Sequence, residues 1–356
     1  MLAYRYISLH FLKYFIIILS ALVFFMLGLD YMENADKLNS SANLLVIYMV
    51  YKSFFAIDML LPISLVFAMI STKLLLIRSN ALVSFYSLGY SRIDILKPFI
   101  VVSSLIIFLF ISFHLSPSFA RAGEFSKNIR NNSEYLSPTR DLFFTFKKQF
   151  IYFSKLSPLQ KKAEGIRVFS TKNGSLKEVI VASEATYENN NWHIKEADVL
   201  VKPDKISFSS LGITITKKND LQILHGFRPK MIDQVYEGKV NFTILDAFEA
   251  YSLLKNQNLS TDTIEGSLYK IFIYPFFAPC LIVIIFFFVP ISVRFLNISF
   301  FSFVAILSTL LIWGILFMLS ELSNNKTISN ELGILLPIFL LFFIAFRQYK
   351  QHRLST

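Results

Sequence analysis

Six long apolar segments constrain what this chain can fold into. A membrane-spanning helix needs about 20 mostly apolar residues, and segments of this kind occur three times before and three times after a polar central block. We therefore expect six transmembrane helices in a three-plus-three arrangement. The predicted spans are Tyr6–Leu29, Phe54–Ile77, Phe99–Leu115, Leu268–Ile291, Ile298–Ser320 and Leu332–Phe346.

Composition supports membrane residence and argues against nucleic-acid binding. The chain has 356 residues, of which 54% are hydrophobic and only 17% charged, whereas about a quarter of the residues in soluble proteins are charged. The net charge of +11 would suggest a nucleic-acid partner in a soluble protein. Here many cations adjoin the spans, where they set membrane orientation, so we expect no nucleic-acid partner.

The short loops predict the orientation of the spans. Lys and Arg accumulate on the cytoplasmic side, and one set of loops and ends holds Arg5, Lys13, Arg78, Arg92, Lys97, Arg294, Arg347, Lys350 and Arg353. The opposite loops hold Lys37, Lys52 and Lys326 together with Asp30, Glu33, Asp36, Glu321 and Glu331. We expect both termini in the cytoplasm and the central block outside. The first apolar segment exceeds the roughly 7–15 residues of a signal peptide core, so we expect it to be retained.

The central block, residues 120–265, is predicted to be a β domain. The stretches "KEVIVASEATY", "NWHIKEADVLV" and "DKISFSSLGITIT" are rich in β-branched and aromatic residues, and turn signals such as Asn173-Gly174 separate them. Successive strands without helices between them favour a sandwich or β-jellyroll. A helix is expected in "NFTILDAFEAYSLLKNQN". The fold class is thus an α+β membrane protein divided into residues 1–119, 120–265 and 266–356.

Signatures of catalysis are missing from the sequence. There is no phosphate-binding loop, no nucleophile elbow and no H-E-x-x-H metal pair. The five histidines show no metal-ligand spacing, and the single cysteine, Cys280, has no partner for an intrachain disulfide. We expect no catalytic residues, no metal and no cofactor in this chain. If it does energetic work, the nucleotide must bind to another protein.

Polar residues and prolines inside the spans leave alternatives open. Asp58 and Lys73 lie near the two ends of the second span, where such side chains can snorkel to the interface. Asp58 is either a proton carrier or an interfacial residue. The prolines within spans, namely Pro62, Pro275, Pro279 and Pro337, mark either simple kinks or gating hinges.

The polar segment 76–98, "LIRSNALVSFYSLGYSRIDILKP", contains the best candidate for a functional site. Its apolar residues recur at helical spacing, and they are Ala81, Leu82, Phe85, Tyr86 and Leu88. Such a helix either lies on the membrane surface or inserts its apolar face into a groove of a partner protein.

Local sequence signals predict the end of this short helix and the start of the next one. Gly89 can adopt the left-handed conformation that ends a helix. Ser91 followed by Asp94 forms a capping-box pattern, which predicts the start of the third span.

Four features of the sequence match a known family. They are segment 61–98, the strands of 174–199 with an Ala-x-x-Ala stretch before a Trp, the run "RPKMIDQ" followed by 241–276, and the three-plus-three plan around a β domain. Together, over essentially the full length, the chain resembles the lipopolysaccharide export permeases LptF and LptG. The "NNWHI" and "RPKMID" segments favour the LptG type, whereas "FVPISV" also resembles LptF.

The resemblance implies an ABC transporter subunit. It implies a second, LptF-like permease, a cytoplasmic LptB-like ATPase dimer that binds ATP and Mg, and LptC/LptA-like jellyroll proteins that form a periplasmic bridge. Lipopolysaccharide would leave the outer leaflet of the inner membrane through the spans and pass to the β-jellyroll. The helix at about 79–90 corresponds to the family's coupling helix, which docks on the ATPase. Its implied residues are Arg78, Asn80, Ala81, Leu82, Phe85, Tyr86, Leu88, Gly89 and Arg92.

Two observations argue against carrying over every residue role from the family to this chain. The family often has a glutamate at the start of this helix, where the chain has Asn80-Ala81. Lys37 and Lys52 are candidates for binding lipopolysaccharide phosphates, but they are also typical interfacial lysines, and neighbouring acids would repel phosphate.

The alternative function is a mechanotransmitting or signalling subunit that moves no lipid, although such proteins usually have four spans.

Overall fold

The computed structural model describes most of the chain in two compact units. The described residues are 2–38, 42–130, 139–146, 149–157, 161–172, 175–188, 191–203, 212–225, 227, 243–255, 261–288 and 297–354. Residues 1–130 and 265–356 form one unit, and residues 131–264 form the other. Chain segments that are far apart in sequence thus build a helical unit around an inserted second unit.

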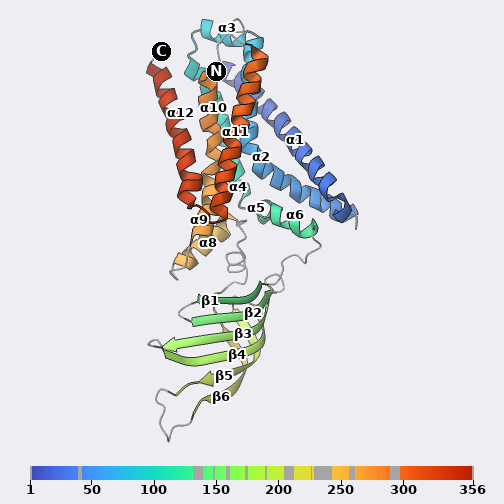
Figure 1. Cartoon of the computed structure of the whole chain (residues 1–356), viewed down its shortest axis with the longest axis vertical. Helices are drawn as coiled ribbons and strands as arrows, with labels where there is room; N and C mark the ends of the chain where they lie inside the picture. The colour runs from blue at the N-terminus through green and yellow to red at the C-terminus, as the bar shows by residue number, and fades with distance from the viewer. Residues whose placement is uncertain are drawn as a thin grey trace. The chain divides into compact units, whose positions relative to one another are not determined.

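The helical unit contains the elements shown in Figure 1. Before the insertion these are α1 (Leu2–Leu38), α2 (Ala42–Arg78), α3 (Ala81–Ser87), α4 (Arg92–Phe113), α5 (Pro117–Ala120) and α6 (Ala122–Arg130). After it come η1 (Tyr274–Phe276), α10 (Phe277–Phe288), α11 (Ile298–Asn324), η3 (Glu331–Leu335) and α12 (Leu336–Leu354), preceded by α9 (Asp262–Phe272), which belongs to this unit from Glu265 on. The first boundary between the units lies at 130/131, after α5 and α6, which contact α2.

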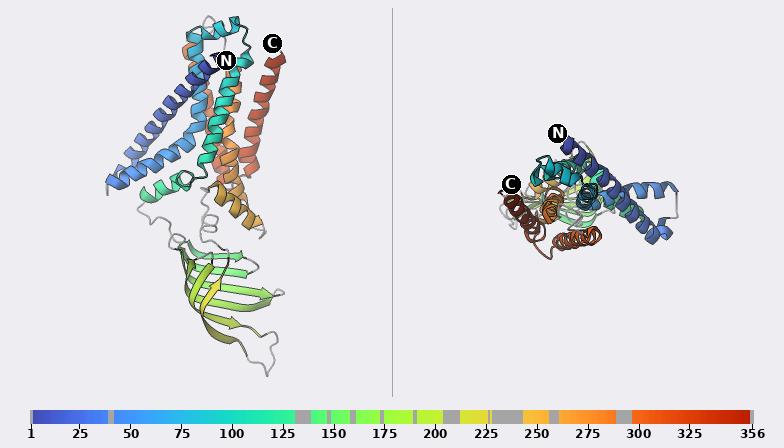
Figure 2. Two further views of the ribbon diagram at one scale, coloured as in Figure 1. Left: turned by 180° about the vertical axis from the view of Figure 1, so that it is seen from behind. Right: turned by 90° about the horizontal axis from the view of Figure 1, so that it is seen from above.

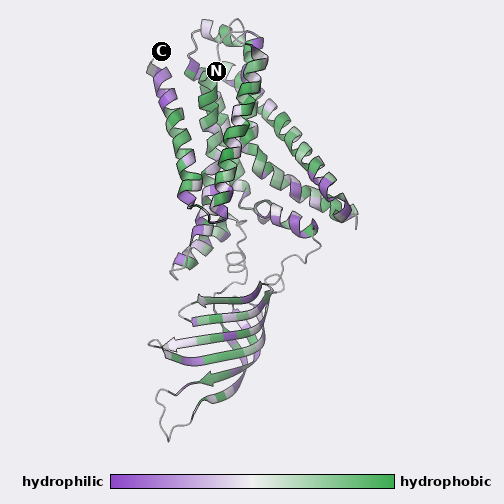
Figure 3. Ribbon diagram, viewed as in Figure 1, coloured by the Kyte–Doolittle hydropathy of each residue, from purple (hydrophilic) through white to green (hydrophobic). Residues whose placement is uncertain are grey.

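All six predicted spans are present as apolar helical segments, and residues 289–291 at the end of the fourth lie outside the described part of the chain. Segments long and apolar enough to cross a bilayer are Leu2–Asp36, Ala42–Arg78, Arg92–Phe113, Asp262–Phe288, Ser299–Asn324 and Glu331–Arg353. Hydrophobic residues dominate along them in Figure 3. The prediction of an α+β membrane protein with three spans on each side of an inserted sheet is confirmed.

The first two spans are longer than their apolar runs predicted. Helices α1 and α2 each contain 37 residues, because polar residues continue both helices beyond the hydrophobic stretch. Two side chains of α2 bind the same residue of α1: the Lys52 ammonium lies 2.6 Å from one carboxylate oxygen of Asp30, and the Tyr48 hydroxyl donates to the other. These contacts join the polar ends of the two helices.

Proline has different effects in different spans. Pro62 lies inside a continuous α2, whereas Pro275 lies in the short 3-10 segment η1, which separates α9 from α10. Because proline lacks an N–H donor and clashes with the preceding turn, the fourth span is broken where a single helix was expected. In the sixth span, Pro337 follows the π-helical turn η3.

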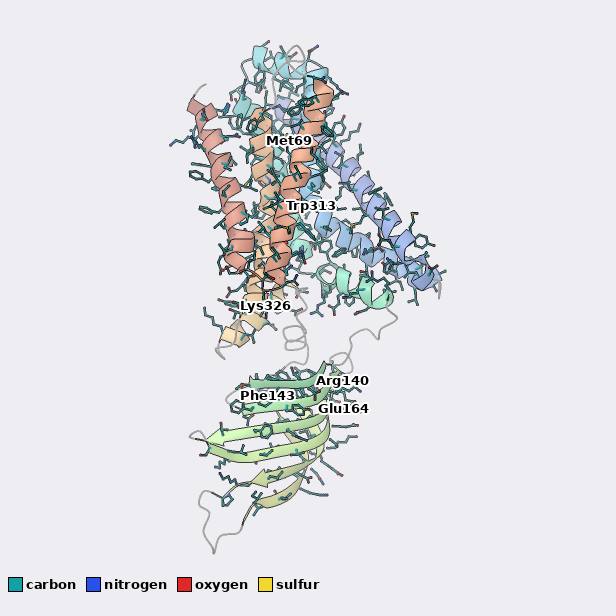
Figure 4. All side chains as sticks on the ribbon, in the orientation of Figure 1. Met69, Arg140, Phe143, Glu164, Trp313 and Lys326 are labelled. Atoms are coloured by element: carbon teal, nitrogen blue, oxygen red, sulfur yellow. The ribbon has the colours of Figure 1, made fainter. Side chains whose placement is uncertain are left out.

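Both chain ends and α3 lie at the same end of the helical unit. This is visible in the two side views of Figures 1 and 2. Lys326, one of the cations predicted for the opposite loops, lies at the other end in Figure 4. The arrangement agrees with an even number of spans, and the assignment of sides to cytoplasm and periplasm stays a prediction.

The inserted unit contains an antiparallel sheet with strands in sequence order. The strands are β1 (Thr139–Phe146), β2 (Gln149–Ser157), β3 (Lys162–Lys172), β4 (Ser175–Glu188), β5 (Asn191–Val201) and β6 (Thr214–Ile223), and the expected helix is α8 (Ile244–Lys255). The described strands form one curved meander (Figure 2). The inserted β domain is confirmed, and its β-jellyroll topology stays a prediction. The predicted turn at Asn173-Gly174 and residues 204–211 of the predicted third stretch lie outside the described residues.

An aromatic cluster forms the core of the sheet. Phe153 is fully buried and its ring lies 5.7 Å from that of Phe144 and 5.5 Å from that of Trp192. Phe227 stacks on Phe144 at 4.8 Å, and its carbonyl accepts a hydrogen bond of 3.0 Å from the Trp192 indole. The cluster joins β1, β2 and β5 to the segment after β6.

We expect Phe153→Ala to lower the free energy of unfolding of the sheet by about 3–5 kcal/mol, the usual cost of a large aromatic cavity. Denaturation of the full chain in detergent, followed by Trp192 fluorescence in a Trp313→Phe background, measures this cost. The matched control is Phe143→Ala, because Phe143 is 53% exposed on β1 (Figure 4) and mainly stacks on Phe150. Its loss should cost less than about 1.5 kcal/mol; equal costs would contradict the assigned core.

Candidate functional site

The short helix α3 begins at a sharp turn of the backbone. Helix α2 ends at Arg78, and Asn80 then adopts a left-handed conformation with φ of 55°. Asn is one of the few residues that visit this region routinely. Its carbonyl accepts the first hydrogen bond of α3, from the Ser84 N–H at 3.1 Å. Asn80 therefore redirects the chain at the position where the family often has glutamate.

The end of α3 is fixed by a glycine, as predicted. Gly89 has φ of +86°, its N–H donates to the Tyr86 carbonyl, and the Tyr90 N–H donates to the Phe85 carbonyl. This pair of bonds is the Schellman arrangement, in which glycine occupies the left-handed position after the helix. The bonds satisfy carbonyls that would otherwise lack partners.

The predicted capping box then begins α4. The Asp94 N–H donates to the Ser91 hydroxyl, and the Ser91 N–H donates to the Asp94 carboxylate, both at 3.2 Å. The Lys97 ammonium lies 2.7 Å from the other Asp94 oxygen. Both ends of the segment between α2 and α4 are therefore held by local hydrogen bonds.

One face of α3 packs against its own chain. Leu82 is fully buried, and the Phe85 ring makes edge contacts with Tyr6 of α1 at 6.2 Å and with Tyr90 at 6.0 Å. Tyr86 is half-buried, and this burial raises the pKa of its hydroxyl, an effect that the nearby Arg92 opposes. These predicted docking residues thus attach α3 to the helical unit.

The opposite face of α3 is exposed and partly apolar. Leu88 is 72% exposed and Val83 is 40% exposed. Among the other predicted site residues, Arg78, Asn80 and Gly89 are exposed, whereas Ala81 and Arg92 are half-buried. A partner can reach this outer surface of α3, defined by Val83 and Leu88, without disturbing the packing beneath it.

The candidate lipid-binding lysines lie in the α1–α2 hairpin. Lys52 is 13% exposed and its charge is balanced by Asp30. Lys37 belongs to α1, but its side chain lies outside the described part of the chain. The pairing favours the interpretation of Lys52 as a structural interfacial residue over a phosphate ligand.

The buried polar contacts inside the unit were missed by sequence reasoning. Lys73 was expected to snorkel to the interface, but it is buried and donates to the carbonyl of Phe286 near the end of α10. The Asp58 carboxylate lies 3.1 Å from the imidazole of His114, the residue that follows α4. In both cases the partner is far away in sequence, so the sequence showed the polar residue but could not predict its contact. Within the described residues, no three His, Cys, Asp or Glu side chains form a metal-binding group.

Comparison with known proteins is consistent with this architecture. The family model described as "Lipopolysaccharide export system permease LptF/LptG" matches residues 5–351. It covers both types of permease, so the preference for the LptG type stays a prediction. No curated protein matches the sequence.

We expect Asn80→Val to destabilise the start of α3, because a left-handed conformation costs a branched residue about 1–2 kcal/mol more than it costs Asn. Trypsin cleavage after Arg78 or Arg92 of the full chain in detergent should accelerate about 5- to 30-fold. Asn80→Gly is the matched control, since glycine accepts this φ freely, and it should leave the rate near that of the native chain. Equal rates for the two variants would refute the role assigned to Asn80.

Proposed function

Because the chain belongs to the LptF/LptG family of lipopolysaccharide export permeases, we propose that it extracts lipopolysaccharide from the inner membrane as one of two paired permeases. Family membership makes it the permease subunit of a lipopolysaccharide export ABC transporter and a multi-pass inner-membrane protein. The observation that carries the proposal is the full-length match together with six spans around an inserted sheet. The ATP-driven step, the partners and the orientation are the proposed part.

In this proposal a cytoplasmic, LptB-like ATPase dimer docks on the outer surface of α3 and binds ATP and Mg. The chain itself contains no phosphate-binding loop, so the energy must come from another subunit. Apolar side chains presented on a short capped helix are a common way of docking into a groove. The same helix packs against α2, and its Phe85 contacts Tyr6 of α1, so a displacement of α3 would be passed to two spans.

The second permease and the lipid are proposed to meet the chain at α1 and α11. Only 11% of the α1 span and 17% of the α11 span are buried, compared with 72% of the α2 span. The exposed side chains on them are large and apolar, for example Phe24, Phe25, Leu311 and Ile315. Helices with such faces pack against another protein or contact lipid chains.

Delivery is proposed to proceed through the sheet unit to LptC/LptA-like bridge proteins. The unit is an inserted antiparallel domain, and its sheet is curved (Figure 2). A domain of this kind, located in the periplasm, would continue the path of the lipid. This step rests on the family and on the predicted orientation.

We expect Leu88→Asp to remove the ATPase from the complex, because docking would bury an unpaired carboxylate. The tagged chain is pulled down from its own membranes, and the ATP-hydrolysing subunit is identified by its phosphate-loop sequence. The amount of this subunit recovered with the chain should fall at least tenfold. Gln351→Glu is the control, since it adds a negative charge at the exposed end of α12. Phe85→Asp is a poorer test because Phe85 also packs on Tyr6. Normal recovery of the ATPase with Leu88→Asp would exclude docking at this surface.

A photoreactive amino acid at position 25 or 311 should form adducts with lipopolysaccharide, because both positions are exposed on the proposed lipid path. Position 105 is the control, since Leu105 is 63% exposed but lies on α4. Adducts are detected with an antibody to lipopolysaccharide after irradiation of whole cells. A signalling subunit would give no adduct at any position, and that result would favour the alternative function.

A further inference from the structure

A long apolar groove lies between α4, α10 and α12. Its volume is about 720 Å³, within the range of roughly 300–1,000 Å³ that is usual for ligand sites. The floor consists of buried side chains, among them Cys280, Val283 and Ala345. The rim consists of exposed side chains, including Val101, Phe342 and Phe346.

The walls of the groove are held by contacts between the helices. The imidazole of His352 stacks on the Phe287 ring at 4.1 Å, which joins the end of α12 to the end of α10. The Phe286 carbonyl accepts from Lys73, which joins α10 to α2. The groove is therefore a feature of packed helices.

One end of the groove is polar and positively charged. Lys97 and the Tyr349 side chain line it there, and Arg353 follows Tyr349 by one turn on the same face of α12. Asp94 accepts one hydrogen bond from Lys97, but an ammonium has three donors. The same group can therefore bind a phosphate while it remains paired with Asp94.

The groove is long enough to span one leaflet of a bilayer. Leu335 and Tyr349 both line it and are fourteen residues apart in η3 and α12, which is roughly 20 Å along a helix. Half of the roughly 30 Å hydrocarbon core is about 15 Å, so an acyl chain of one leaflet fits along the groove. The lining between these two residues is apolar apart from Ser104.

We propose that this groove binds a bilayer phospholipid, with one acyl chain along α12 and the phosphate against Lys97 and Tyr349. The occupant is assigned to the leaflet on the side of α3 and of both chain ends. Under the orientation given in Proposed function, this is the cytoplasmic leaflet, so the occupant differs from the exported lipopolysaccharide. The site is separate from the exposed faces of α1 and α11.

The test uses the full chain in its native complex, reconstituted in vesicles of phosphatidylethanolamine and phosphatidylglycerol. Either lipid carries a diazirine in its acyl chain, and adducts are mapped by mass spectrometry to peptides of α4, α10 and α12. We expect Val101→Trp, which fills the groove, to reduce these adducts at least fivefold. Leu105→Trp is the matched control, because Leu105 is a lipid-exposed residue of the same helix outside the groove. Equal adducts in both variants would mean a non-specific boundary lipid and would overturn the proposal.

A second experiment tests whether the charge of Lys97 selects the lipid headgroup, with a substitution that leaves the groove volume unchanged. One cation near a membrane surface favours an anionic lipid by about fivefold, so Lys97→Gln should abolish a preference for phosphatidylglycerol over phosphatidylethanolamine. Lys350→Gln, an exposed cation of α12 outside the groove, should retain it. An unchanged preference with Lys97→Gln would overturn the headgroup assignment.

A third arm identifies the source of the acyl chain. Unlabelled lipopolysaccharide added to the vesicles should leave the adducts unchanged, and its displacement of them would overturn the assignment to a phospholipid. The assay needs neither ATP nor lipid export. A negative result for the groove would therefore not contradict the proposed transport function. A negative result for lipopolysaccharide transport would likewise not contradict the assignment of the groove.

Discussion

Within a bilayer no water is available to satisfy backbone N–H and C=O groups, and the helical unit is arranged around this requirement. The cost rises wherever a span stops being a regular helix. The fourth span is broken at η1, and the end of its second part, α10, supplies a carbonyl to the buried Lys73 of α2. The buried lysine thus joins two spans that are separated by the whole sheet unit in the sequence.

The same requirement explains how much of the fold could be predicted. Continuous apolar runs are a sufficient signal for a spanning helix, so all six were found, and the Ser91–Asp94 box and Gly89 were found because caps are local. The extent of α1 and α2 was underestimated, since it depends on Asp30 meeting Lys52 across two helices. The contacts of Lys73 and Asp58 were missed for the same reason. The order of the strands, which is a simple meander in the described residues, also depends on pairings that periodicity does not encode.

For the candidate site, the sequence predicted the helix that the structure contains as α3, but not the division of its faces, and its docking role stays a prediction. Helical spacing predicts that Ala81, Phe85 and Leu88 share one face, with Leu82 and Tyr86 beside it, and all five were assigned to docking. In the structure Leu82 and Phe85 hold the helix against the unit, while Leu88 points away from it. Periodicity alone cannot separate the face that packs on the unit from the exposed face when the helix has only seven residues. This separation would let a partner bind the exposed face without detaching α3.

The pairing of α1 with α2 has a mechanical consequence. Each helix of 37 residues is about 55 Å long at 1.5 Å per residue, nearly twice the hydrocarbon thickness. The pair is clamped near the polar end by Asp30 and Lys52, and at the other end α1 is linked to α3 through Tyr6 and Phe85. A helix as long as α1 would act as a lever: a rotation of about 5° at α3 would displace the far tip of α1 by roughly 5 Å over this length. A small displacement at α3 would thereby become a larger movement at the opposite end of the helical unit.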